Sequence, residues 1–313
     1  MRKEECKLKK LRTFLITITF ILSISILIGC SSPNMIRVYT RDTTSGTRDG
    51  FFQALHFQEA AGNNSMLRRN FVEVAGNGAM INAIRNDRYG IGYITLGSLA
   101  NSGLRGLYIN GVAPTEANVI NGSYRLTRNF NFVVRTEFNE HREALLIDAF
   151  IAFLSTKDAK TTIINNDGIV EIKDDDPIWR DLRHNHPISF EDNSDITIRF
   201  GGSTAVERVA RALSAEFRTK SGGFVAEHNH VGSSDAFRAT QGSERNGSNQ
   251  LHVGFASRDF NHSEVAEPGT SGLLCIEAIV TVVNPRNTVS DINAHQLKEI
   301  FRRDGSIQRW SDL

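Results

Sequence analysis

The chain has 313 residues, a formal net charge of +1 and 40% hydrophobic residues, which is enough for one large domain or two lobes. Residues 1–29 carry six basic and two acidic side chains, so the remaining 284 residues carry a net charge of −3. A body with net negative charge lacks the basic footprint of a nucleic-acid-binding protein, and we exclude that class.

The first segment of the chain has the layout of a secretory signal. Six basic side chains lie within residues 2–12, an apolar run fills Phe14–Gly29, and Cys30 follows. The run of 16 residues is short for a membrane-spanning helix, which needs about 20. We therefore predict a signal peptide over residues 1–29, with an uncleaved membrane anchor as the alternative. The ending LIGC resembles the bacterial lipobox, which implies cleavage before Cys30, a lipid such as palmitate on its sulfur, and a tether over residues 30–35.

The three cysteines leave no pair for a disulfide within the exported chain. Cys6 belongs to the predicted signal, Cys30 is the predicted lipid site, and Cys275 then stands alone. Because Cys275 lies in the apolar run GLLCIEAIVTVVN, we expect a buried and unreactive thiol.

Beyond the tether, strand-like runs alternate with periodic helical segments. In AVERVARALSAEF, which starts at Ala205, apolar residues recur on one helical face. The alternation predicts an α/β fold with mostly parallel sheets. A charged stretch with two prolines, Lys173–Asp195, is the most linker-like part of the chain. The expected strands cover residues 36–40, 90–97, 130–136, 196–200, 252–257 and 275–284, and the expected helices cover 143–154, 205–217 and 292–303.

Three loops rich in glycine, serine and threonine follow a strand and precede a helix. A helix N-terminus has unpaired N–H groups and partial positive charge, so it attracts anions, and Ser or Thr adds hydroxyl donors. For any one loop, a helix cap with nothing bound is the alternative. Three such loops, with Arg41 just before the first, favour a shared anion site. The loops are TTSGT (43–47), GGSTAV (201–206) and VGSSDAF (231–237), and the strand end GFASRD (254–259) adds Ser257 and Arg258.

No motif indicates an enzyme, a metal or a cofactor. The pattern GxxxxGK[ST] does not occur, so nucleotide hydrolysis has no support. Ser45 lacks the surroundings of a hydrolase nucleophile. The histidines at 184–186 and 228–230 have no accompanying cysteine cluster or HExxH motif, and we interpret them as surface or strand-edge residues.

Together these loops resemble the four anion loops of the phosphate-binding proteins of bacterial phosphate ABC importers. RDTTSGTRDGF, at residues 41–51, is the first, and GGSTAV, VGSSDAF and GFASRD are the others. Further matching segments lie at 76–99, 111–134 and 282–313, so the resemblance covers nearly all of 36–313. It implies a two-lobe, type II periplasmic-binding-protein-like α/β fold whose lobes are joined by hinge strands.

The resemblance also implies a function. It implies an extracytoplasmic solute-binding lipoprotein, not an enzyme, which captures inorganic phosphate for delivery to the permease of an ABC importer. It further implies a monomer without a cofactor, held by its lipid on the extracytoplasmic face of the cell membrane. Alternatives are a surface lipoprotein of the same fold that acts as a sensor or adhesin, and a binder of another tetrahedral oxyanion such as sulfate or arsenate.

The matching segments follow an order that differs from the family's order. The family places the GST, GSS and GFAS loops first, whereas this chain starts at the SGT loop and ends at WSDL. We therefore predict a circularly permuted fold in which Lys173–Asp195 joins the family's usual termini. A domain-swapped dimer is the alternative. The expected split lobe comprises residues 34–105 plus 282–313, and the expected contiguous lobe comprises residues 106–281.

The resemblance, carried over residue by residue, places phosphate between the two lobes. A guanidinium can pair with two phosphate oxygens at once, so Arg41 is expected to be the main cation of the site. The remaining donors are hydroxyls and N–H groups of the loops. The expected ligands are Arg41, Ser45, the Gly46 N–H and Thr47 from the split lobe, and Ser203, Thr204, the Ala205 N–H, Ser233 and Ser257 from the contiguous lobe.

Two departures from the family pattern concern acidic residues. Many members place an aspartate at the position of Ser257, where it accepts a hydrogen bond from protonated phosphate. An acidic residue often stands at the position of Thr43, where it orients the arginine. The candidate replacements here are Asp235 or Asp259 for the first role and Asp42 or Asp49 for the second.

Overall fold

The computed structural model describes residues 34–313. The predicted signal peptide over residues 1–29, the predicted lipid site Cys30 and most of the tether lie outside the described residues. Within 34–313, no helix is both long enough and apolar enough to cross a membrane.

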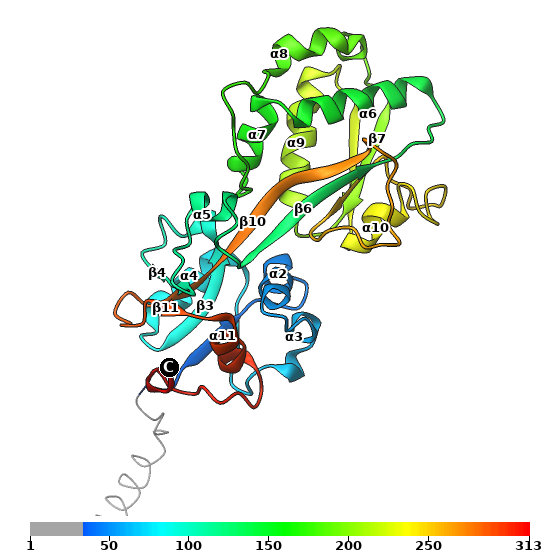
Figure 1. Ribbon diagram of the computed structural model, residues 1–313. Coiled ribbons are helices and arrows are strands. Elements are labelled where there is room, and N and C mark those ends of the chain that lie inside the picture. The colour runs from blue at the N-terminus through cyan, green and yellow to red at the C-terminus, as the bar shows by residue number, and fades with distance from the viewer. Residues whose placement is uncertain (1–33) are drawn as a thin grey trace, which may run out of the picture.

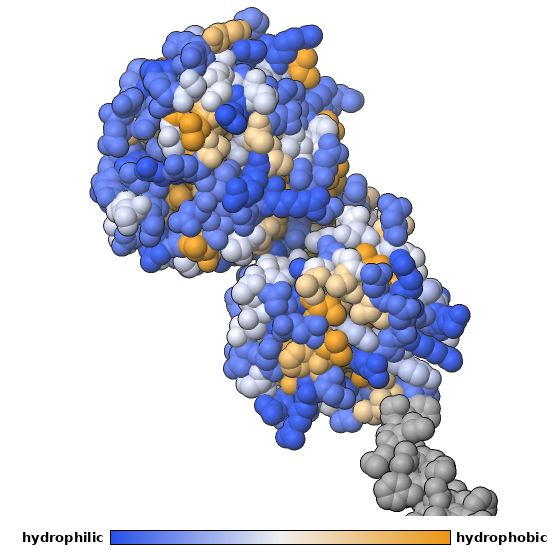
Figure 2. Space-filling model, turned by 180° about the vertical axis from the view of Figure 1, so that it is seen from behind, coloured by the Kyte–Doolittle hydropathy of each residue, from blue (hydrophilic) through white to orange (hydrophobic). Residues whose placement is uncertain are grey.

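Two main hydrophobic cores divide the described chain into two lobes, which Figure 1 shows one above the other. One core takes buried side chains from Phe130 to Cys275, and we call this part the contiguous lobe. The other core mainly combines the two ends of the chain, from Ile36 to Leu126 and from Ala278 to Ile307, and this part is the split lobe. Seen from behind, the lobes meet at a narrower waist (Figure 2).

The contiguous lobe begins later in the chain than the predicted boundary at residue 106. Leu107, Val119 and Tyr124 are buried in the core of the split lobe, so residues 107–126 pack there. Local strand pairing explains the difference. Two short strands of this region, β4 (Arg105–Gly106) and β5 (Tyr108–Ile109), pair with β10 (Ser271–Val283) and β11 (Asp291–Ile292), respectively.

One mixed sheet runs through both lobes. The first half of β10 pairs antiparallel with β6, and its second half pairs antiparallel with β3. Pairs toward the two ends of the sheet, such as β1 with β3 and β7 with β8, are parallel. The prediction of mostly parallel sheets is therefore wrong at the centre, where the chain crosses between the lobes in opposite directions. The strand order is β2 (Val72–Glu73), β1 (Arg37–Thr40), β3 (Gly90–Thr95), β10, β6 (Thr127–Val134), β9 (Val253–Ala256), β7 (Thr197–Gly202) and β8 (Val225–His230).

Helices flank the sheet in both lobes (Figure 1). The three predicted helices are present, and the apolar face predicted for the one after Ala205 is buried at Val209, Leu213 and Phe217. The helices of the split lobe are α2 (Gly46–Ala54), α3 (Glu59–Gly62), α4 (Gly76–Asn86), α5 (Glu116–Ile120) and α11 (Ala294–Phe301). Those of the contiguous lobe are α6 (His141–Leu154), α7 (Lys157–Ile164), α8 (Trp179–Leu182), α9 (Glu207–Lys220) and α10 (Ser233–Arg238).

The two ends of the described chain are joined inside the split lobe. The N–H of Ile36 donates to the carbonyl of Gln308 at 2.9 Å, and the N–H of Arg68 donates to that of Phe301 at 2.9 Å. The Phe301 ring packs against Phe51, with 5.0 Å between ring centroids. The C-terminal end lies at the base of this lobe in Figure 1, and Cys275, in contrast, is buried in the contiguous lobe, as predicted.

The segment Lys173–Asp195 is packed rather than loose. Trp179 is 2% exposed and belongs to the core of the contiguous lobe. The backbone N–H of Trp179 donates to Asp158 Oδ2 at 2.8 Å, and Lys160 Nζ donates to Asp176 Oδ1 at 2.6 Å. Asp176, one of the charges that made the segment resemble a linker, therefore binds α7. Its role as the junction of the family's usual termini stays a prediction.

A buried ion pair lies where β6 and β10 cross between the lobes. Arg128 and Glu277 face each other in the strand register, and Arg128 Nε lies 2.6 Å from Glu277 Oε2. Their side chains are 3% and 10% exposed. Removal of one partner from such a pair leaves an uncompensated buried charge.

We expect Arg128→Met to lower the free energy of unfolding by about 3–5 kcal/mol, because Glu277 would remain buried without its partner. Urea denaturation followed by circular dichroism measures the change. The double variant Arg128→Met/Glu277→Leu should recover most of the loss. Arg180→Met, which removes an exposed pair with Asp181, is the matched control and should have little effect. If the single and the double variant lost equal free energy of unfolding, the loss would not come from an unpaired, buried Glu277.

Candidate functional site

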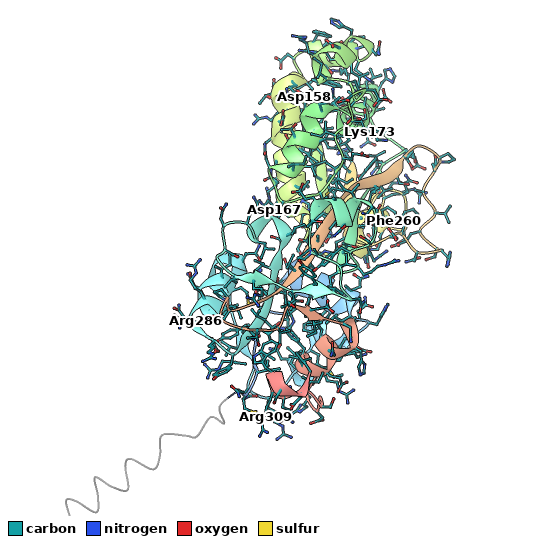
Figure 3. The ribbon with its side chains drawn as sticks, turned by 60° about the vertical axis from the view of Figure 1, so that its left-hand side comes forward. Asp158, Asp167, Lys173, Phe260, Arg286 and Arg309 are labelled. Atoms are coloured by element: carbon teal, nitrogen blue, oxygen red, sulfur yellow. The ribbon has the colours of Figure 1, made fainter. Side chains whose placement is uncertain are left out.

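A cavity of about 170 Å³ lies between the two lobes. Figure 3 shows Asp167, one of its lining residues, at the level where the lobes meet. The lining residues come from the split lobe, from the contiguous lobe and from the strands that connect them. They are Arg41, Thr47, Asn77, Thr95, Phe130, Asn166, Asp167, Ala205, Arg208, Val209 and Glu277.

Three helices direct their N-terminal ends toward this cavity. Thr47, Asn77 and Arg208 line it, and they are the second residues of α2, α4 and α9. A helix N-terminus carries partial positive charge and unpaired N–H groups. Three such ends near one guanidinium, that of Arg41, form an environment that favours an anion.

Arg41 is held from several sides but keeps unused donors. Its Nη1 donates to Asn77 Oδ1 at 3.2 Å, and its backbone N–H donates to the hydroxyl of Tyr93 at 3.2 Å. Its Nε is buried and has no hydrogen-bond partner within residues 34–313. A buried charged donor without a partner is costly, so this atom indicates a missing acceptor.

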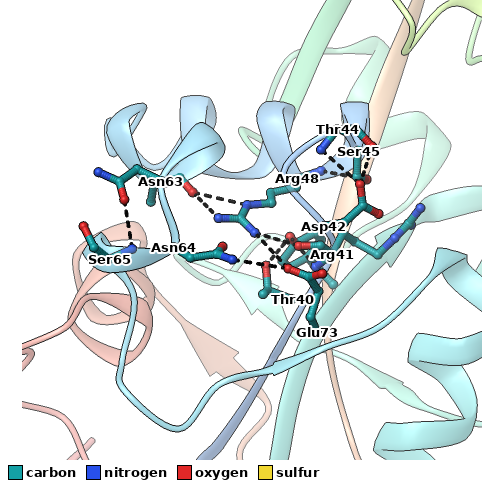
Figure 4. A network of polar contacts seen from close by, with 12 residues as sticks. Thr40, Arg41, Asp42, Thr44, Ser45, Arg48, Asn63, Asn64, Ser65 and Glu73 are labelled. Carbon is teal, nitrogen blue, oxygen red and sulfur yellow. Dashed lines mark hydrogen bonds and ion pairs between the residues drawn. The ribbon is translucent and has the colours of Figure 1, made fainter.

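Arg48 fixes the loop that carries Arg41. Its side chain is fully buried, its Nη1 donates to the Arg41 carbonyl at 2.8 Å, and its Nε and Nη2 donate to the carbonyl of Ala60 (Figure 4). Burial lowers the pKa of this guanidinium, and Glu73, 3.9 Å away, opposes that shift. No sequence pattern predicts a role for Arg48, because an arginine in a helix is ordinarily exposed.

The two predicted anion loops nearest the hinge touch each other directly. A Cβ on Gly46 would lie 2.4 Å from the Cβ of Ala205, so the absence of a side chain at Gly46 permits the contact. The predicted donor at Ala205 is already engaged, because its N–H donates to Ser203 Oγ at 3.2 Å. Ser45 caps α2 through Arg48 N at 3.5 Å. Neither Ser45 nor the exposed Thr204 lines the cavity.

The three predicted serine ligands of the contiguous lobe form a hydrogen-bonded cluster, and none of them lines the cavity. Ser257 Oγ lies 3.0 Å from Ser203 Oγ and 3.1 Å from Ser233 Oγ. Two hydrogen bonds use two of the three hydroxyl hydrogens, so one remains to donate to an anion, where the sequence predicted three donors. Ser203 and Ser257 are buried and Ser233 is partly exposed, so Ser233 is nearest the solvent.

The candidate acidic residues from the sequence have other partners. Asp42 accepts the N–H of Thr44 at 3.0 Å, and Asp49 lies 3.7 Å from Arg128. Asp259 accepts from Asn131 at 3.1 Å, and Asp235 pairs with Arg238.

The carboxylates that line the cavity are instead Asp167 and Glu277. Asp167 lies 2.5 Å from Arg208, and Glu277 lies 2.6 Å from Arg128. Their segments have no glycine-hydroxyl pattern, so no local motif predicts these two residues.

The histidines of β8 form a hydrogen-bonded chain. The Ser203 carbonyl can only accept, so His230 Nδ1, 3.1 Å away, donates to it, and His230 Nε2 accepts from His228 Nδ1 at 3.1 Å. Burial lowers the pKa of His228 to about 4 and also lowers that of His230, so both rings are neutral near pH 7. Across the described part of the chain, no three potential metal ligands gather.

Known proteins of similar sequence carry phosphate-binding names. A family model described as a PBP superfamily domain matches residues 189–313. The chain is 26% identical over 309 residues to the phosphate-binding protein PstS 2 of Streptococcus agalactiae serotype V, which covers 96% of this chain and 97% of that one. It is 24% identical over 285 residues to PstS 2 of Streptococcus pneumoniae serotype 4, which covers 90% and 89%. These relatives confirm the resemblance that the motifs predict.

A solved structure confirms the predicted two-lobe α/β fold. The crystal structure of a phosphate-binding protein of a phosphate ABC transporter from Streptococcus pneumoniae TIGR4 matches with a TM-score of 0.71 and 22% identity, over 89% of this chain and 99% of that chain. The relatives align along nearly the whole of both chains, so this chain shares its segment order with them. The predicted circular permutation, relative to a family order that starts with the GST loop, is not confirmed by these relatives.

We expect Gly46→Ala to hold the lobes apart, because the new methyl group would overlap Ala205. Small-angle X-ray scattering should show a larger radius of gyration than in the unmodified protein. Gly62→Ala is the matched control, since a Cβ there meets nothing within 4 Å. An unchanged radius in Gly46→Ala would contradict direct contact of the loops in solution.

We expect the free energy of unfolding to fall as the pH drops below about 6.5, the ordinary pKa of histidine. Burial lowers the pKa values of His228 and His252 to about 4 in the folded state, so the unfolded state takes up protons first. The stabilisation is complete above the unfolded pKa and is lost as the pH falls toward the folded one. Urea denaturation across this range measures it. His252→Gln should reduce the slope of the free energy of unfolding against pH, and His262→Gln, at an exposed position, should not. If His252→Gln and the unmodified protein have equal slopes, the buried histidine is not the origin of the pH dependence.

Proposed function

We propose that the protein captures inorganic phosphate between its two lobes and delivers it to an ABC importer. The observation that carries the proposal is the interlobe cavity, where Arg41 meets the N-terminal ends of α2, α4 and α9. The relatives and the matching structure support it, because their names describe phosphate-binding proteins and, for the structure, a phosphate ABC transporter.

The binding energy comes from charged hydrogen bonds. Each hydrogen bond to a charged group contributes roughly 1.5–3 kcal/mol, and micromolar affinity corresponds to about −8 kcal/mol. The donors that line the cavity are the guanidinium of Arg41 and the hydroxyl of Thr47, beside the N-terminal N–H groups of α2, α4 and α9. Together they supply the binding energy from which the cost of closure is subtracted.

Both lobes supply donors, so the bound anion favours the closed arrangement over the open one. Binding of phosphate requires no covalent step. The proposed role is therefore that of a carrier and not of an enzyme.

The two cavity carboxylates provide selectivity. Asp167 and Glu277 accept a hydrogen bond from protonated phosphate, whereas fully ionised sulfate has no proton to offer and is repelled. They take the role that the sequence suggested for Asp235 or Asp259.

We further propose that the protein acts outside the cytoplasm as a monomer, tethered to the membrane by a lipid on Cys30. The composition of residues 1–30 supports this, as the sequence pattern is that of a lipoprotein signal. The permease of the importer is the proposed receiving partner.

We expect Arg41→Ala to weaken phosphate binding about a hundredfold or more, because two charged hydrogen bonds are lost. Isothermal titration calorimetry measures the affinity. Arg286→Ala is the control, because Arg286 is exposed and lies away from the interlobe level (Figure 3). Sulfate should bind more weakly than phosphate in parallel titrations. Unchanged affinity in Arg41→Ala would remove this residue from the site, and absence of phosphate binding by the unmodified protein would refute the function.

A further inference from the structure

We propose that Asn77 is the positioning residue of the site: it orients the Arg41 guanidinium toward the anion and leaves its positive charge unneutralised. This inference rests on the proposed function, since it concerns how Arg41 meets phosphate. It assigns to a neutral amide the role that the sequence analysis sought in Asp42 or Asp49.

The orientation of the Asn77 amide is fixed by its neighbours. Its Nδ2 donates to Thr95 Oγ1 and to Ser98 Oγ, each at 2.9 Å. Both amide hydrogens are thereby used, so the carbonyl oxygen Oδ1 points to Arg41 Nη1, 3.2 Å away. Thr95 Oγ1 lies 3.0 Å from Ser98 Oγ, so the three side chains form a closed ring of hydrogen bonds beside the cavity.

The contact with Asn77 selects which edge of the guanidinium meets the anion. Nη1 is occupied by Asn77, whereas the buried Nε has no partner in the described chain. No hydrogen bond within that part of the chain uses Nη2 either. Nε and Nη2 form one side of the planar group, with two parallel N–H donors, so they match two oxygens of a single oxyanion.

Asn77 holds this arrangement without adding negative charge. Within residues 34–313, Arg41 has no carboxylate within ion-pair distance, because Asp42 binds Thr44 and Asp49 lies beside Arg128. An aspartate at position 77 would hold the same nitrogen but would offset its charge and repel phosphate. The structure therefore separates two tasks, orientation and charge, which a carboxylate would combine.

The experiment compares Asn77→Asp with Asn77→Ala by calorimetric titration of inorganic phosphate. We expect both to bind more weakly than the unmodified protein, and Asn77→Asp to lose at least about tenfold. The affinity of Asn77→Asp should recover partly as the pH is lowered toward the pKa of the new carboxyl, relative to Asn77→Ala at the same pH. Asn82→Ala, an exposed position on the same helix, should bind normally.

The melting temperature measured without phosphate shows whether a substitution at position 77 weakens binding by changing the position of Arg41 or by destabilising the fold. Asn77→Asp gains an ion pair with Arg41 and should melt no lower than Asn77→Ala, although it binds phosphate less well. The inference is overturned if Asn77→Asp binds as tightly as the unmodified protein, or if both variants bind as Asn82→Ala does. These results leave the proposed function intact, whereas failure of the unmodified protein to bind phosphate overturns both.

Discussion

The arrangement of the two lobes depends on β10, the strand that belongs to both. Its first half pairs with β6 along one edge and its second half pairs with β3 along the other, so two ladders of backbone hydrogen bonds set how the lobes face each other. The Arg128–Glu277 pair lies in the ladder between β10 and β6, and Phe130 and Glu277 also line the cavity. The wall of the cavity is thus part of the hinge, so any rotation of one lobe against the other changes the shape of the site.

The cavity gathers positive charge that the protein alone does not fully neutralise. The N-terminal ends of α2 and α9 approach each other at Gly46 and Ala205, and like ends of two helix dipoles repel. Both carboxylates of the cavity, Asp167 and Glu277, are already paired with arginines. An anion between the helix ends removes the repulsion, which links binding to closure.

Local patterns allowed much of the fold to be predicted, since alternating strand and helix periodicity marks elements without knowledge of their partners. The glycine-hydroxyl loops were also visible, because a loop that leads into a helix is defined by neighbouring residues. Asp167, Asn77 and Glu277 could not be found in this way, because they come from segments far apart in the sequence that only the tertiary fold brings to one cavity. The serine donors were overcounted, because their mutual hydrogen bonds depend on tertiary contacts. The charges of 173–195 suggested a linker, although Asp176 binds Lys160 of α7 and Trp179 is buried in the core of the contiguous lobe.

The union of residues near 36 and near 307 in one lobe constrains the order of folding during synthesis. Residues such as Phe51 emerge early, yet their neighbour Phe301 emerges almost last. The contiguous lobe has its whole core once Cys275 has appeared, and it can form while the other lobe waits. During that interval the early apolar side chains lack their final packing and are exposed to aggregation. The interval in which residues 276–307 are synthesised is on the order of seconds at ribosomal speeds of about 5–20 residues per second.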